Sequence, residues 1–299
     1  MFNPLLLVAT ILSALLVSIL PPLVAPDLYN QCFFHYSSAT LKFDNTAWTW
    51  ATDYGLSVWM GFGIIPLLRN AAAKKGGVIS LLSHNSAMLL LCYASSVFFG
   101  AICHQNYNSF NSTNPSNLNT LSFRFFWTLC VASVSCAGGY IGSTATILQK
   151  QWEQTGETVF FHSMQFPSVS FWRFYSAIAV IVTIFGFFSM CRPACDIFLA
   201  GVTHTLPFFV LVYVGIGGLL GRKKKPIWPF AVLFYGCLGN SPLLWLYPFM
   251  VHNTSLSLGH INGLLHLSLF TSWGAQMISL MHFSDVSVIK FRNNNSKKI

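Results

Sequence analysis

Ionisable side chains are rare in the long apolar segments of this chain, and those present are mainly aspartate and histidine. Asp53 opens one segment, His104 closes the next, and His266 lies in the last. A carboxylate with imidazoles can bind a metal ion or transfer protons. Inside a membrane such groups face a partner or a cavity. We therefore expect one site, in which Asn262, one helical turn before His266, is a supporting residue.

Two further residues are expected at about the same depth in the membrane as Asp53, His104 and His266. Asp196 and His204 are eight residues apart, on roughly one face of a helix, and are expected to support the site. Simpler interpretations stand beside these. Asp53 follows a threonine-rich stretch and can cap a helix. His204 lies near Pro207 and can satisfy carbonyl groups freed by a kink.

The composition indicates which elements must position these residues. Hydrophobic residues make up 54% of the chain and charged residues only 8%, far from the balance of a soluble domain. The apolar runs are long and do not alternate, which predicts helices and not membrane strands. The net charge of +9 comes from bases at the ends of these runs, where membrane topology explains them. We therefore predict an all-α integral membrane protein and no nucleic-acid partner.

The apolar runs predict a seven-helix bundle over residues 53–283. It is preceded by an apolar segment at 1–25, either a signal peptide or an eighth helix, and by a lumenal or extracellular aromatic segment at 26–52. A basic tail follows at 284–299. The seven expected spans are residues 53–68, 78–104, 121–147, 171–190, 195–220, 227–249 and 260–282.

Lysine and arginine predict the orientation of the bundle. They gather in alternate loops, including the run 222–225, and in the tail, and such loops are cytoplasmic. The base-poor loops contain the glycosylation sequons at Asn111 and Asn253. Both signals place the start of the bundle outside or in the lumen and the C-terminus in the cytoplasm. The membrane is that of the endoplasmic reticulum or the cell surface.

The cysteines fall into two groups. Cys92, Cys130, Cys136 and Cys237 lie inside predicted spans, where a thiol acts as a small apolar side chain. Cys32, Cys103, Cys191 and Cys195 lie on the predicted lumenal side, where disulfides persist. Four thiols allow three pairings, all of which remain open.

The polar set resembles that of CREST-type seven-helix membrane proteins, the group of alkaline ceramidases, progestin and adiponectin receptors and lipid-remodelling factors of glycosylphosphatidylinositol anchors. The resemblance rests on Asp53, on Gly100-x-x-x-His104 and on Asn262-x-x-x-His266. It implies a zinc-assisted hydrolase of lipid amides or esters, with His104 and His266 as ligands and Asp53 orienting or activating water. The chain departs from the family by lacking His-x-x-x-His in its last span.

Three function classes follow from these features. The first is a lipid hydrolase or a degenerate relative with a lumen-facing site, whose partners are membrane lipids. The second is a seven-helix receptor. The third is a transporter or scaffold in which the histidines form an ion path. The sequence contains no Gly-x-Ser-x-Gly, phosphate-loop or His-Glu-x-x-His motif of familiar soluble enzymes.

Overall fold

The computed structural model describes residues 4–33, 42–109, 116–155, 166–187, 191–221 and 226–286. Within these ranges every regular element is an α-helix, as predicted. The helices are α1 (Pro4–Val24), α2 (Pro26–Phe33), α3 (Ala47–Ala73), α4 (Val78–Asn106), α5 (Leu121–Gln154), α6 (Val169–Phe187), α7 (Pro193–Gly221), α8 (Trp228–Leu238), α9 (Ser241–Asn253) and α10 (Leu258–Phe283).

Six helical segments in the described part are long and apolar enough to cross a membrane: α3, α4, α5, α6, α7 and the joined pair α8 and α9. A shorter apolar helix spans Val8–Val24 within α1. The last long helix, α10, is not among the six, so the predicted count of seven is not confirmed. The six apolar helices do agree with the predicted class of multi-pass helical membrane protein.

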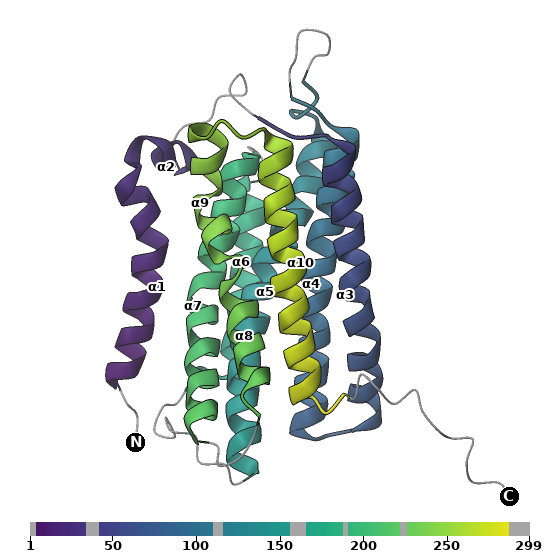
Figure 1. Cartoon of the computed structure of the whole chain (residues 1–299), viewed down its shortest axis with the longest axis vertical. Coiled ribbons are helices and arrows are strands. Elements are labelled where there is room, and N and C mark those ends of the chain that lie inside the picture. Colours follow the sequence, from purple (N-terminus) through teal and green to yellow (C-terminus); the bar gives the residue numbers. More distant parts are fainter. Residues whose placement is uncertain are drawn as a thin grey trace, which may run out of the picture.

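The long helices run side by side in one bundle (Figure 1). α3 packs against α4, α4 against α5, and α5 against both α6 and α7. α10 packs mainly against α3 and α8 and also contacts α4 and α9, while α1 lies against α7. One face of α10 is therefore buried in the bundle, and it carries the polar side chains of Asn262, His266, Ser272, Gln276 and Ser279.

The outer helices present apolar side chains outward. On α6, Phe174 is 64% and Phe185 81% exposed. A water-soluble protein rarely leaves such a surface open, whereas lipid accepts it. The outward face of α6 therefore fits a lipid-facing surface.

Three glycines of α5 allow its neighbours to approach closely. A Cβ atom at Gly138 would lie 2.7 Å from the Thr203 carbonyl oxygen of α7. One at Gly139 would lie 2.2 Å from the Trp172 carbonyl oxygen of α6, and one at Gly142 would meet the Trp172 ring at 2.3 Å. Close backbone approach at small residues is the usual packing device between helices in membranes.

The predicted start of the first span of the bundle was wrong. α3 begins at Ala47, six residues before Asp53, with Thr46 at the N-cap, so Asp53 lies inside the helix and does not cap it. The aromatic segment predicted at 26–52 therefore contains both α2 and the first turn and a half of α3.

The predicted span 227–249 is broken into α8 and α9. Gly239 and Asn240 separate the two helices, and Pro242 follows in the first turn of α9. A proline has no N–H to continue the helical ladder and disfavours a helical residue before it. Hydroxyl groups satisfy carbonyls at the break: Ser241 donates to Cys237 O at 3.1 Å, and Ser268 donates to Gly239 O at 3.1 Å.

The structure assigns a disulfide to a cysteine of α7. Cys195, in the first turn of α7, is bonded in this way, whereas Cys103 and Cys191 at the same end are not. The four cysteines predicted to act as apolar side chains are not bonded in this way either.

Candidate functional site

A cavity of about 80 Å³ lies towards the end of the bundle at which α3, α7 and α10 begin. This exceeds the roughly 10–15 Å³ that one water molecule needs, so the cavity has room for several. Its walls are mostly apolar, with a few polar side chains that converge on the space. These are Asp53 of α3, Ser96 and His104 of α4, Cys130 of α5, Asp196 of α7, and Asn262 and His266 of α10.

Asp53 and His266 form a buried pair across the contact between α3 and α10. His266 Nε2 lies 3.1 Å from Asp53 Oδ1, and the two side chains are only 8% and 5% exposed. A charge buried among apolar helices is costly unless it is paired. The pair therefore satisfies one oxygen of the carboxylate and leaves the other, Oδ2, for a second partner.

Thr52 fixes the other side of the His266 ring. Its hydroxyl oxygen lies 2.7 Å from His266 Nδ1 and also within 2.9 Å of the Trp48 and Thr49 carbonyl oxygens. The single hydroxyl proton goes either to a carbonyl or to Nδ1. In each arrangement the hydrogen bond between Nε2 and Oδ1 requires a proton between those atoms. Both ring nitrogens of His266 are therefore engaged.

His104 is held in one tautomer by a backbone group. Its Nδ1 lies 2.5 Å from the Asp44 carbonyl oxygen. A carbonyl oxygen only accepts, so Nδ1 must donate and Nε2 carries the lone pair of the neutral ring. Phe43 stacks on the imidazole at 4.6 Å between ring centroids, with an interplanar angle of 6°. Nε2 is thus the atom of His104 that remains for chemistry.

The carboxylate of Asp44 joins the segment before α3 to α10. It accepts hydrogen bonds from Thr49 Oγ1 at 2.5 Å, Thr46 N at 3.0 Å and Asn262 Nδ2 at 3.0 Å. Tyr247 of α9 in turn donates to Asn262 Oδ1. Burial alone would raise the pKa of Asp44, but these hydrogen bonds outweigh it and hold the pKa below the usual value of 3.8.

Sequence reasoning missed Asp44. It stands before the helix and outside every apolar run, and its contact to His104 uses a backbone atom that any residue has. The one available signal was local: an aspartate two residues before Thr46 and five before Thr49 is typical of a polar turn that starts a helix.

Glycine at position 100 keeps the second oxygen of Asp53 uncovered. A Cβ atom built on Gly100 would lie 3.5 Å from Asp53 Oδ2 and 3.6 Å from Cys130 Sγ. Both are ordinary contact distances, so a methyl group would fit there and would cover the oxygen. The space beside Oδ2 thus has the size of a small group or a water molecule.

The structure brings Asp196 to this cavity but not His204. Asp196 Oδ2 accepts from Trp127 Nε1 at 2.7 Å and from Arg192 N at 2.9 Å. Its other oxygen, Oδ1, is buried without a hydrogen-bond partner in the described part of the chain. His204 lies two turns further along α7, beside Tyr93, and its Nδ1 donates to Ala200 O at 2.7 Å.

The donor set does not assemble into a metal centre. Among the described residues, no three histidine, cysteine, aspartate or glutamate side chains lie close enough to hold one ion together. Asp53 and His266 are bonded to each other, and His104 lies across the cavity wall with its own backbone partner. The described residues therefore do not fit a zinc site in which His104 and His266 bind the ion and Asp53 acts on its water.

The two predicted glycosylation sites have different outcomes. Asn253 ends α9 and is exposed, at the same end of the bundle as Cys195 and the cavity. Asn111 lies outside the described residues.

Comparison with protein-family models, with curated proteins and with solved structures finds no match to this chain. The resemblance to CREST-type proteins thus remains a prediction, and the function is argued from the site itself.

Proposed function

We propose that this chain is a membrane-embedded hydrolase of lipid amide or ester bonds, with Asp53 as the catalytic group. The observation that carries the proposal is the buried pair of Asp53 and His266, which leaves Asp53 Oδ2 in the wall of a cavity with room for several water molecules. An apolar pocket with a few convergent polar groups is the usual form of a site for an apolar ligand.

The geometry assigns a role to each side chain. Asp53 Oδ2 accepts a proton from a water molecule in the cavity while the water oxygen attacks the carbonyl carbon of the lipid. The proton then passes to the leaving nitrogen or oxygen as its bond to that carbon breaks. His104 Nε2 accepts a hydrogen bond from the second O–H group of the water. This bond orients the water, and its hydrogen stays on the attacking oxygen. His266, fixed by Thr52, and Asp44, through its carbonyl group, are positioning residues.

The proposed topology agrees with a site open to the lumen. α10 has 26 residues, about 39 Å of helix, against a hydrocarbon core of about 30 Å, so we count it as the seventh span. The Cys195 disulfide and the exposed Asn253 lie at the cavity end, whereas Lys74, Lys75 and Lys150 lie at the other end. Disulfides and glycans belong to the lumenal or extracellular side, and lysines to the cytoplasmic side. Because α1 packs against α7, we take it as a retained helix.

A glycine substitution tests the proposal without removing any catalytic group. Gly100→Ala adds a methyl group at ordinary contact distance from Asp53 Oδ2 and, inside a helix, is worth up to about 1 kcal/mol in stability. We expect the variant to be as stable as the wild type or more so. Its hydrolysis should fall at least tenfold, because the methyl group takes the place of the attacking water.

The assay is release of fatty acid from a panel of fluorescent lipid amides and esters by purified protein in vesicles. The matched control is Gly61→Ala, on α3, where a Cβ atom meets nothing within 4 Å. Asp53→Asn should abolish release. Equal activity of wild type and Gly100→Ala would show that Oδ2 does not face the reacting water. If the wild type released fatty acid from none of the lipids, the hydrolase proposal would fail, and receptor and transport assays would be the next experiments.

A further inference from the structure

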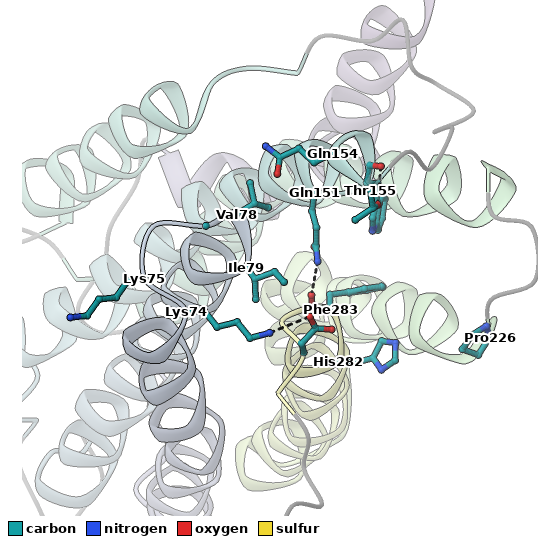
Figure 2. A pocket seen from close by; sticks show the side chains of 13 residues that line it. Lys74, Lys75, Val78, Ile79, Gln151, Gln154, Thr155, Pro226, His282 and Phe283 are labelled. Carbon is teal, nitrogen blue, oxygen red and sulfur yellow. Dashed lines mark hydrogen bonds and ion pairs between the residues drawn. The ribbon is translucent and has the colours of Figure 1, made fainter.

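A second, larger pocket of about 690 Å³ lies at the opposite end of the bundle from Asp53. It is formed where the turn between α3 and α4, the end of α5, the start of α8 and the end of α10 meet (Figure 2). The volume lies within the range of about 300–1,000 Å³ that small-molecule sites occupy. The hydrolase site does not use any residue of this pocket.

One wall of the pocket is positively charged. Lys74 and Lys75 follow α3 directly, and the N-terminus of α4 comes three residues later, at Val78. No side chain caps this helix, since Gly77 holds the N-cap position without a side-chain hydrogen bond. The first N–H groups of a helix carry a partial positive charge and bind anions. Figure 2 shows that Lys74 extends towards the end of α10, whereas the Lys75 side chain points away from Lys74. The Lys74 ammonium group and the helix terminus thus act on the same space.

The remaining walls combine apolar and polar groups. Val78, Ile79 and Phe283 supply apolar surface, and Gln151 crosses the pocket to donate to Phe283 O at 3.0 Å. Trp228 packs edge-on against His282 at 4.9 Å between centroids and is 46% exposed. Exposed tryptophan is typical of the membrane surface. The pocket therefore lies at the depth of lipid headgroups.

The anion that Lys74 meets in the structure is Asp285. The distance from Lys74 Nζ to Asp285 Oδ2 is 3.4 Å, and both side chains are largely exposed, at 43% and 60%. Asp285 has a left-handed backbone, with φ of 56°, and its N–H and that of Val286 close α10 by bonding to His282 O and Met281 O. The fold thus holds a carboxylate beside the lysine, in a weak ion pair that another anion can displace.

We propose that this pocket binds a phosphate-bearing anion through Lys74 and the N-terminus of α4, with Lys75 at the rim of the pocket. The shared chemistry is a phosphate group, supplied either by a lipid headgroup or by a soluble phosphate compound. Basic pockets between membrane helices are known to take phosphate headgroups. The inference is independent of the proposed hydrolase activity.

The test measures binding on the full chain in nanodiscs of phosphatidylcholine with increasing amounts of phosphatidic acid, read as thermal stabilisation. A second arm adds inorganic phosphate to nanodiscs without the anionic lipid. Near a membrane surface one lysine is worth about 1 kcal/mol, or about fivefold in affinity. Lys74→Gln should weaken binding about fivefold, and Lys75→Gln should weaken it less, because the Lys75 side chain points away from Lys74.

Two further variants make the result specific. Asp285→Asn keeps a residue that tolerates the left-handed backbone but removes the competing charge, so binding should strengthen about fivefold. Lys150→Gln removes an exposed charge of α5 that does not line the pocket, and binding should not change. The proposal is overturned if Lys150→Gln weakens binding as much as Lys74→Gln, or if neither phosphatidic acid nor inorganic phosphate stabilises the wild type. Stabilisation by both that depends on Lys74 would identify a site for soluble phosphate as well.

Discussion

Replacing Asp44 by asparagine tests whether the polar network above α3 holds the site together. The carboxylate accepts hydrogen bonds from Thr49, Thr46 and Asn262 at 2.5–3.0 Å. Asparagine has one acceptor oxygen, so at least one buried donor loses its partner and the remaining bonds lose their charge. A hydrogen bond to a charged group contributes about 1.5–3 kcal/mol. We expect Asp44→Asn to lower the free energy of unfolding by about 2–3 kcal/mol near neutral pH.

The stability that the Asp44 carboxylate contributes should depend on pH, in a direction set by its pKa. The native pKa of Asp44 lies below the ordinary 3.8, so the native state binds the proton less readily than the unfolded state. Its stabilisation is fully present above the unfolded pKa and is lost as pH falls through the lower native pKa. The difference in free energy of unfolding between wild type and Asp44→Asn should therefore be constant from about pH 7 to pH 5 and should shrink below about pH 4.

Thermal unfolding in nanodiscs as a function of pH measures that difference. Asp27→Asn is the matched control, because it makes the same change at an exposed position in the first turn of α2, where a carboxylate is worth at most about 1 kcal/mol. The reasoning fails if Asp44→Asn is no less stable than Asp27→Asn, or if its deficit stays the same in acid.

Three other results are expected. Gly138→Ala should cost about 1–3 kcal/mol in stability, because its Cβ atom would lie 2.7 Å from a backbone oxygen of α7, and Gly61→Ala, measured beside it by thermal unfolding, should not. Thr52→Val should reduce hydrolysis about 10- to 100-fold, by analogy with the loss of a group that orients a ligand histidine, and should shift the pH–rate profile, which a purely structural defect would not do. Treatment with a chelator should leave hydrolysis unchanged, since Asp53 acts directly on water; activity that is lost and then restored by zinc would require a different arrangement of His104 and His266.

The membrane helices were largely predictable because lipid leaves the backbone few choices. An apolar run must satisfy its own hydrogen bonds, and α4 and α5 begin at Val78 and Leu121 as predicted. The start of α3 was not predictable in this way. It is set by the turn at Asp44, whose carboxylate bonds to Asn262, 218 residues away along the chain.

The candidate site was likewise predictable only in part. The sequence predicted that one cavity would contain Asp53, His104 and His266. The prediction was possible because ionisable residues are rare in apolar helices and because these three lie at a common depth. The pairing of Asp53 with His266, and not with His104, depends on how α3 and α10 pack. Neither the tautomer of His104 nor the uncovered oxygen at Gly100 has a sequence signal, because one comes from a backbone carbonyl group and the other from a missing Cβ atom.

The most direct test of the hydrolase proposal is mass spectrometry of the fatty acid released from lipid amides or esters in ¹⁸O-labelled water, with wild type and Asp53→Asn in the same vesicles. The account predicts that each acid released by the wild type gains one oxygen from the solvent and that Asp53→Asn releases none above background. Acid without solvent oxygen, or equal labelled release by both proteins, would contradict the claim that Asp53 activates water in this cavity.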